Sequence, residues 1–464
     1  MEPLSETTVS RSDELLAEAL RRLVRRGKRS DITRLLSKVR PGDMSVVLLG
    51  LTPAERLLVF QIVTEDYPDT AGEVLSDLEA PQRLELLEKL PPEVIAEILE
   101  SAAVDDAVHV IDSLPEDRRE RVLELVDPQQ LSEMRPHLAY EEDTAGRIMN
   151  PEFFALPELA TVRQAIAAIQ EKRDVEMIYY VYVVDSAKHL LGVGSLRQLL
   201  LSRPDQRLGE LMQRDIIQVH TDTDQEEVAA IVARHDLFAV PVVDDENRLV
   251  GIVTVDDIVD VVKEEANEDI LRIAGTSEDE LLYQERSFRV AGIRLPWLLI
   301  NLVGGVITGL LLEHFQVSFQ EALFLLAFVP VVMGMGGNSG TQTTTITIRG
   351  LATGRVELSR GRIRHYLWQQ TKVGALLGLA TGTVAGTVAL VLQRNPAYSV
   401  VVGGAMFLTI LVASFNGVII PLLFERIGVD PAVAAGPLVT TSNDITGILI
   451  YFGLASLLIQ FLVK

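Results

Sequence analysis

The sequence has no cysteine among its 464 residues, which excludes disulfides, thiolate metal sites and thiol catalysis. Acidic residues are nearly missing from its C-terminal part, because only six of the 65 lie after position 285. Residues 1–285 therefore carry 59 acids against 30 bases, a net charge of −29, and the remainder carries 12 bases against six acids, a net charge of +6. The acidic part would repel the phosphates of nucleic acid, so we expect cations or basic partners and no nucleic acid.

The C-terminal part consists of long apolar segments. Each approaches or exceeds the roughly 20 residues needed to cross the hydrocarbon of a bilayer. Buried core helices of a soluble protein are a poor alternative, because five such segments follow one another with almost no charge. Residues 286–464 are therefore predicted to form a five-helix α transmembrane bundle. The segments cover about 298–312 (extended by 290–297), 322–337 (running to 345), 373–392, 400–424 and 431–463.

Basic residues predict the orientation of these spans, because cytoplasmic loops are enriched in Lys and Arg. One cluster of arginines precedes the first span, and another lies between the second and third spans. We therefore expect the acidic N-terminal part and residues 425–430 to be cytoplasmic, in a multi-pass protein of the cell (inner or plasma) membrane. The basic residues are Arg286, Arg289, Arg294, Arg349, Arg355, Arg360, Arg362 and Arg364.

Asp444 lies deep in the fifth apolar segment. A carboxylate at that depth costs about 2.5–3.5 kcal/mol on insertion scales, so it should face a partner or a water-filled cavity. No Lys or Arg lies in the core of any span, which makes a cation the natural partner. Gly436, Thr440 and Asp444 are spaced i, i+4, i+8 and would share one helix face. Such a face suits Mg²⁺, which is usually held by one or two carboxylates and several waters.

Small and polar residues end the second apolar segment, in GMGGNSGTQTTTIT (334–347). They could form a helix-packing stripe, since small residues pack transmembrane helices. Asn338 and Gln342 share a face that would also suit a wet passage. Both interpretations remain open, and they are compatible with each other.

The cytoplasmic part divides into two patterns. Residues 1–140 contain short amphipathic segments separated by Leu-Pro turns, which predict an all-α superhelical domain of stacked hairpins. Residues 141–263 contain a duplication, in which 191–198 aligns with 250–257 and each unit has the order helix, strand, turn, strand, helix. This α+β pair resembles tandem cystathionine-β-synthase-type (CBS) modules, a regulatory fold.

The CBS resemblance implies a nucleotide site at a hydroxyl residue followed three positions later by Asp. The second unit keeps this pair as Thr254 and Asp257. The first unit has Ser195 and Arg197 but ends the pattern with Gln198, so one of two ATP sites is in doubt.

Residues 254–275 carry acids at largely helical spacing, in a segment that leads into the first apolar span. A solvated helix face is the alternative interpretation. However, like charges at i, i+4 destabilise a helix by a few tenths of a kcal/mol each, and only Lys263 offsets them here. The segment is therefore expected to depend on bound divalent ions. Its acids are Asp256, Asp257, Asp260, Glu264, Glu265, Glu268 and Asp269.

Five motifs occur in order along the chain: EEDTAGRIM (141–149), TDTDQEEVA (221–229), VGIVTVDDIVDVV (250–262), GMGGNSGTQ (334–342) and DPAVAAGPLVTTSNDITG (430–447). In order and spacing the chain resembles the MgtE family of magnesium transporters over nearly its whole length. The resemblance implies a homodimer in the lipid bilayer with a pore that holds Mg²⁺ at Asp444, near Thr440, Gly436 and Asn338. Family members commonly have Asn at the position of Gly436.

The resemblance also implies a connecting helix at roughly 264–285, which cytosolic Mg²⁺ holds in the closed position by joining the acidic domains. Asp430 would be the partner of that helix. Asp105 would belong to an acidic pair whose second member is here His109, so we expect a weaker or pH-sensitive site. The sensor acids implied are Asp105, Asp224, Glu226, Asp236, Asp257, Asp260, Glu265, Glu268, Asp269 and Asp430.

The sequence thus predicts feedback-gated Mg²⁺ uptake by a protein that is not an enzyme, since no nucleophile–base set, phosphate loop or metal-hydrolase motif is present. An ion-coupled divalent cation carrier is one alternative, because Gly and Pro interrupt the second and fifth spans. A membrane-anchored acidic scaffold is another, although it leaves Asp444 without a purpose.

Overall fold

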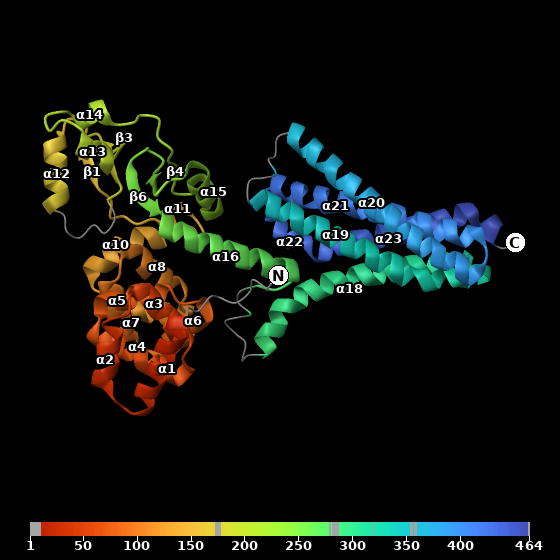
Figure 1. Ribbon diagram of the computed structural model, residues 1–464, viewed down its shortest axis with the longest axis horizontal. Coiled ribbons are helices and arrows are strands. Elements are labelled where there is room, and N and C mark those ends of the chain that lie inside the picture. Colours follow the sequence, from red (N-terminus) through yellow and green to blue (C-terminus); the bar gives the residue numbers. More distant parts are fainter. Residues whose placement is uncertain are drawn as a thin grey trace. The chain divides into compact units, whose positions relative to one another are not determined.

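The computed structural model describes residues 11–171, 178–277, 280, 287–318, 320–352, 356 and 360–462. The chain forms two compact units, residues 1–262 and 263–464. Figure 1 shows the helical and mixed parts of the first unit and the long helices of the second. The predicted multidomain organisation is confirmed, and the exact borders 140, 263 and 285 stay predictions.

Short helices make up the N-terminal domain, as its Leu-Pro pattern predicted. Proline stands in the first two positions of most of them, where its missing N–H is not needed. A capping box between Thr52 and Glu55 begins α4. One apolar core unites these helices. They are α1 (Arg11–Arg25), α2 (Arg29–Leu36), α3 (Pro41–Leu49), α4 (Pro53–Asp66), α5 (Pro68–Ser76), α6 (Ala80–Lys89), α7 (Pro92–Ser101), α8 (Val104–Asp112), α9 (Glu116–Leu123) and α10 (Pro128–Leu138).

The duplicated region forms two three-stranded sheets with the same topology, in the orders β1-β2-β3 and β4-β5-β6. In each, the first pair is parallel and the second antiparallel, with an irregularity at the same place. The predicted duplication is therefore confirmed. Its elements are α11 (Ala145–Ile148), β1 (Ala155–Pro157), α12 (Val162–Glu171), β2 (Tyr180–Val184), β3 (Leu190–Ser195), α13 (Leu196–Leu201), α14 (Leu208–Leu211), β4 (Val219–His220), α15 (Gln225–His235), β5 (Ala239–Val243) and β6 (Leu249–Thr254).

Helix α16 (Val255–Ala274) follows β6 directly and contains the first part of the predicted connecting helix. It begins nine residues before the predicted start at 264. It ends at Gly275, whose φ of +78° is a left-handed conformation that glycine adopts without strain. Residues 278–279 and 281–286, at the end of the predicted connecting helix, lie outside the described residues.

The second unit contains five helices long and apolar enough to cross a membrane, which confirms the predicted bundle. The third of these begins at Arg360 and not near 373, because its basic first turns continue the helix. Glycines bring α20 against α21: a Cβ on Gly382 would lie 2.6 Å from the Gly403 carbonyl oxygen. The elements are α18 (Ser287–Ser318), the 3₁₀ segment η1 (Gln320–Phe328), α19 (Val329–Ala352), α20 (Arg360–Gln393), α21 (Pro396–Arg426), α22 (Pro431–Ala435) and α23 (Pro437–Leu462).

Candidate ion pathway and sensor sites

The fifth apolar segment is not one helix. Helix α22 ends at Ala435, Gly436 has a non-helical ψ of −85°, and α23 starts at Pro437. The prediction that Gly436 lies within a continuous helix is therefore wrong. Its carbonyl nevertheless accepts a hydrogen bond from the Thr440 N–H at 3.3 Å. Gly436 thus precedes the first turn of α23, with Thr440 and Asp444 above it.

The surroundings of Asp444 follow from its neighbours on α23. Thr441 packs against Gly304 of α18, and Asn443 packs against Gly340 of α19, each without room for a glycine Cβ. At 100° per residue, Asp444 lies about 60° from the direction of Thr441 and about 100° from that of Asn443. Its half-buried side chain has neither a hydrogen bond nor an ion pair to any residue that the structure describes.

The face of α23 that carries Asp444 becomes apolar toward the C-terminus. Ile448 and Tyr451 follow Asp444 at i+4 and i+7, and both are 1% exposed. The Tyr451 hydroxyl donates to the Leu325 carbonyl oxygen at 2.8 Å, which ties this end of α23 to η1. The polar part of the face therefore runs from the start of α23 to Asp444 and stops there.

Helix α19 carries a polar stripe on its outer surface within the membrane span. Asn338, Thr341, Gln342 and Thr345 are exposed, and their spacing places them on one side of the helix. Lipid cannot satisfy such groups, so this side needs water, an ion or another chain. Asn338 and Asp444, which the structure both describes, are not hydrogen-bonded to each other, and both remain predicted pore residues.

Asp105 and Asp257 are neighbouring carboxylates of the first unit, and the charge of Asp106 acts on both. The Asn150 Nδ2 group donates to the Asp105 carboxylate at 3.0 Å. Asp257 accepts hydrogen bonds from both the backbone N–H and the hydroxyl of Thr254. Burial raises the pKa of Asp105 further than the nearby charge of Asp257 does, and burial is also the main reason that the pKa of Asp257 is raised. Such a pair favours a proton or a divalent cation between its members.

This carboxylate pair predicts a pH dependence of stability. A carboxyl whose pKa is higher in the folded than in the unfolded state contributes stability that is present at low pH and lost as pH rises through the folded pKa. We expect the melting temperature of the purified protein in EDTA to fall as pH rises above the ordinary carboxyl pKa of 3.8. Mg²⁺, or Asp105→Asn, should flatten this profile. An unchanged slope in both cases would contradict the assignment.

His109, the second member of the expected pair, lies against a basic side chain. Its ring contacts the guanidinium of Arg83. Burial first, and then the charge of Arg83, lower the pKa of His109 to about 3. Both effects disfavour the charged imidazolium, and the expectation of a weaker or pH-sensitive site at this position stays a prediction.

Several predicted sensor acids have structural positions in the first unit. Asp224 accepts from the Glu226 N–H at 2.8 Å and caps the start of α15. Asp236 caps its end with a φ of +49°. Twelve residues of helix separate the two by roughly 18 Å, so they cannot share an ion within one chain. Asp260 and Glu265 lie on α16.

The last turn of α16 contacts α22 within the second unit. Arg272 forms ion pairs with Glu268 and with Asp430. Asp430 also accepts from the Ala432 N–H at 2.7 Å and caps α22. Burial, and then the charge of Asp430, raise the pKa of Asp269, whereas Arg272 opposes this shift. The structure thus brings Glu268, Asp269 and Asp430 together around a guanidinium that the sequence analysis overlooked.

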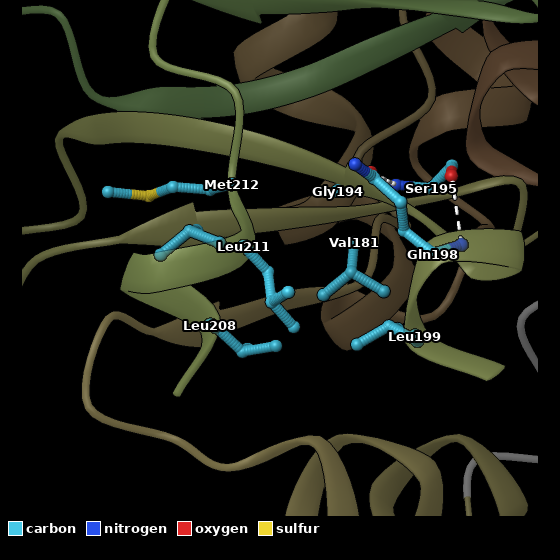
Figure 2. Close-up of a pocket in the computed structure, with 9 residues that line it drawn as sticks. Val181, Gly194, Ser195, Gln198, Leu199, Leu208, Leu211 and Met212 are labelled. Carbon is cyan, nitrogen blue, oxygen red and sulfur yellow. Dashed lines mark hydrogen bonds between the residues drawn. The ribbon is translucent and has the colours of Figure 1, made fainter. Parts of the chain in front are cut away.

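The predicted nucleotide residues behave differently in the two CBS units. In the first, Ser195 and Gln198 cap α13 reciprocally, with distances of 3.2 and 3.3 Å between each side chain and the partner's backbone N–H (Figure 2). The cavity beside them has a volume of about 10 Å³, far too small for a nucleotide. Arg197 is exposed on α13. The Thr254–Asp257 pair of the second unit remains the better candidate.

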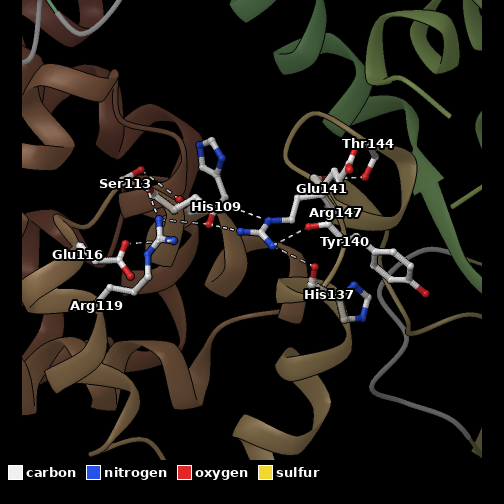
Figure 3. Close-up of polar contacts among 10 residues, drawn as sticks. His109, Ser113, Glu116, Arg119, His137, Tyr140, Glu141, Thr144 and Arg147 are labelled. Atoms are coloured by element: carbon white, nitrogen blue, oxygen red, sulfur yellow. Dashed lines mark hydrogen bonds and ion pairs between the residues drawn. The ribbon is translucent and has the colours of Figure 1, made fainter. Parts of the chain in front are cut away.

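Arg147 joins the N-terminal helices to the first CBS helix, and the sequence analysis did not single it out. Its side chain is 7% exposed and pairs with Asp112 through two bonds, one of them 2.8 Å from Nε. It also donates to the carbonyls of His137 and Tyr140 at 3.1 and 3.2 Å (Figure 3). The sequence signal that could have identified Arg147 is a basic residue between apolar neighbours in EEDTAGRIM.

Comparison with known families matches all three parts of the chain. The model "Divalent cation transporter" (MgtE) covers residues 329–454, the "MgtE intracellular N domain" covers 39–143, and the CBS domain covers 145–204 and 208–264. The magnesium transporter MgtE of Thermus thermophilus is 38% identical over 458 residues, which are 97% of this chain and 99% of that protein. The magnesium transporter MgtE of Bacillus subtilis is 33% identical over 450 residues, covering 97% and 98%.

A solved structure also resembles the first half of the chain. The cytosolic domain of the Mg²⁺ channel MgtE in complex with ATP is 38% identical, with a TM-score of 0.49, and covers 53% of this chain and 99% of that one. The fold and the sites define a multi-pass membrane transport protein with a cytosolic N-terminal part and a CBS module. The chain belongs to the MgtE family.

Proposed function

We propose that the chain carries Mg²⁺ into the cell along a passage beside Asp444, and that cytosolic Mg²⁺ bound to its acidic part closes this passage. The observation that carries the proposal is a carboxylate inside an apolar bundle, without a positive partner among the described residues, in a chain whose relatives are named magnesium transporters. Those names indicate transport and not catalysis, so we assign no catalytic step.

A homodimer is part of the proposal. Leu200 and Leu201 on α13 are 65% and 77% exposed, and Val259 and Val262 on α16 are 49% and 51% exposed. These two helices follow equivalent strands of the two CBS units. A second copy of the chain, related by a two-fold axis, would cover their exposed apolar side chains. A second copy would also allow Asp224 and Asp236, too distant within one chain, to contribute to shared ion sites.

Feedback follows from the charge of the cytosolic part. Its acids repel one another when ions are scarce, and ions that bind only the closed arrangement shift the equilibrium toward it. Arg272 supports the closed arrangement by holding the last turn of α16 against the start of α22, because it pairs with Glu268 and Asp430. We propose that Mg²⁺ strengthens this contact through the neighbouring carboxylates of Asp269 and Asp430.

ATP is proposed as a second ligand of the CBS module. The family match identifies two CBS units, and the Thr254–Asp257 pair has the expected residues in the second. Because Asp257 also faces Asp105, a nucleotide bound there would act beside a proposed Mg²⁺ sensor site. The first unit is a weaker candidate, because Gln198 occupies the Ser195 side chain.

An ion-coupled carrier is the second candidate. The break between α22 and α23 at Gly436 favours it, since discontinuous helices with free backbone groups form the ion sites of many carriers. Unitary currents separate the two mechanisms, because only a channel produces them.

The proposal is tested in a bacterial strain that lacks its own Mg²⁺ uptake. We expect the wild-type gene, but not the empty vector, to restore growth at low Mg²⁺. Inside-out membrane patches that contain the protein should then show currents that disappear when Mg²⁺ is raised on the cytosolic face. Failure to restore growth would reject Mg²⁺ uptake, and currents that ignore cytosolic Mg²⁺ would reject the feedback.

A further inference from the structure

A buried amide pair lies beside the proposed pathway. The Asn416 Nδ2 group on α21 donates to Asn443 Oδ1 on α23 at 3.1 Å. Asn443 is 2% exposed, and its Nδ2 lies against Gly340 of α19. A single side chain of α23 is thus wedged between two other spans. None of the motifs that point to the pathway assigns it a role.

The position of the pair on the helix links it to Asp444. Asn443 directly precedes Asp444, and the two side chains leave a rigid helix about 100° apart. Holding Asn443 between α19 and α21 therefore fixes the direction in which Asp444 points. This matters because α23 is not continuous with α22: the break at Gly436 removes the constraint that a longer helix would give.

We propose that Asn416 and Asn443 are positioning residues that set the rotation of α23 and so the ion affinity of Asp444. This inference rests on the proposed function, since it concerns the same pathway. Interhelical hydrogen bonds in membranes contribute little to stability on average. A gain in folding stability therefore does not explain why two amides are buried here. Their effect on the direction of the neighbouring carboxylate explains it better.

The chain offers a matched control for this pair. The hydroxyls of Ser339 and Ser414 also form a buried bond between α19 and α21, at 3.1 Å, but neither contacts α23 through it. Loss of either bond loosens a helix interface. Only loss of the amide bond should change the direction of Asp444.

The experiment measures Mg²⁺ uptake into proteoliposomes as a function of external Mg²⁺, for full-length wild type, Asn416→Leu, Asn443→Leu, the double variant and Ser339→Ala. We expect each asparagine variant to raise the half-saturating Mg²⁺ concentration about tenfold, and the double variant to do no more than either single one, as for contacting residues that act as a unit. Ser339→Ala should leave this concentration unchanged. Asn416→Ser, which is too short to reach Asn443, gives the same test if Asn416→Leu does not fold.

The outcomes distinguish a failure of the proposed function from a failure of the positioning role. No Mg²⁺ uptake by the wild type would reject the proposed function. With an active wild type, asparagine variants whose half-saturating concentration is unchanged, even if less folded protein is recovered, would overturn the positioning role. An equal shift in Ser339→Ala would also overturn it, because the effect would then belong to helix packing in general.

Discussion

Asp444→Ala is expected to abolish Mg²⁺-dependent growth rescue without reducing the amount of protein in the membrane. A carboxylate at this depth costs about 2.5–3.5 kcal/mol on insertion scales, so its removal should favour insertion. Without this carboxylate, α23 offers no negative charge to offset the water that a cation gives up beside it. Growth at low Mg²⁺, with the protein quantified in isolated membranes, provides the measurement.

Two further variants make this result specific. Asp444→Asn has nearly the same shape but no charge, and it should fail as Asp444→Ala does. Glu313→Gln removes an acid from the exposed end of α18, outside the polar face of α23, and it should support growth as the wild type does. Equal rescue by Asp444→Ala and the wild type would remove Asp444 from the ion pathway.

Arg147→Ala is expected to destabilise the cytosolic part by about 3 kcal/mol, near the lower end of the range for breaking a buried ion pair. The side chain is 7% exposed and joins Asp112 to two backbone carbonyls. Its loss leaves those carbonyls and part of the Asp112 charge uncompensated. Arg119, 3.6 Å from Asp112, limits the effect. The melting temperature of the cytosolic part, measured by calorimetry of the purified full chain, should fall by about 6–12 °C.

Arg214→Ala provides the control for this prediction. Arg214 pairs with Glu158 at 3.0 Å, but their side chains are 64% and 42% exposed. An exposed pair contributes about 0–1 kcal/mol, so the melting temperature should change little. If both variants shift it equally, burial does not distinguish the two ion pairs and the joining role of Arg147 is lost.

Local patterns were sufficient to predict the elements of this fold. Apolar segments without charge are long enough to cross a bilayer wherever they pack, and the strand pattern of the duplication recurs as two sheets with the same topology. The break at Gly436 was harder to predict. Pro437 was visible, but proline also occurs inside the helices α18 and α21 without ending them, so its effect depends on the neighbouring helices.

The candidate sites likewise include residues that the sequence identifies and contacts that only the tertiary structure reveals. Asp444 could be identified from the sequence because a charge in an apolar segment has a cost that does not depend on its neighbours. Asp105 and Asp257 are 152 positions apart, and their pairing required packing of the N-terminal helices on the CBS module. The same holds for Arg272 with Asp430 and for Asn416 with Asn443.

The sequence by itself determined the membrane class, the acidic cytosolic part, the duplication and the family, because each depends on composition, spacing or motifs along the chain. Only the tertiary structure decided which residues meet. It placed His109 against Arg83, and it made Arg147 the link between the N-terminal helices and the first CBS helix. Burial and partners set the charge and the energy of such groups, and both arise only when distant segments pack together.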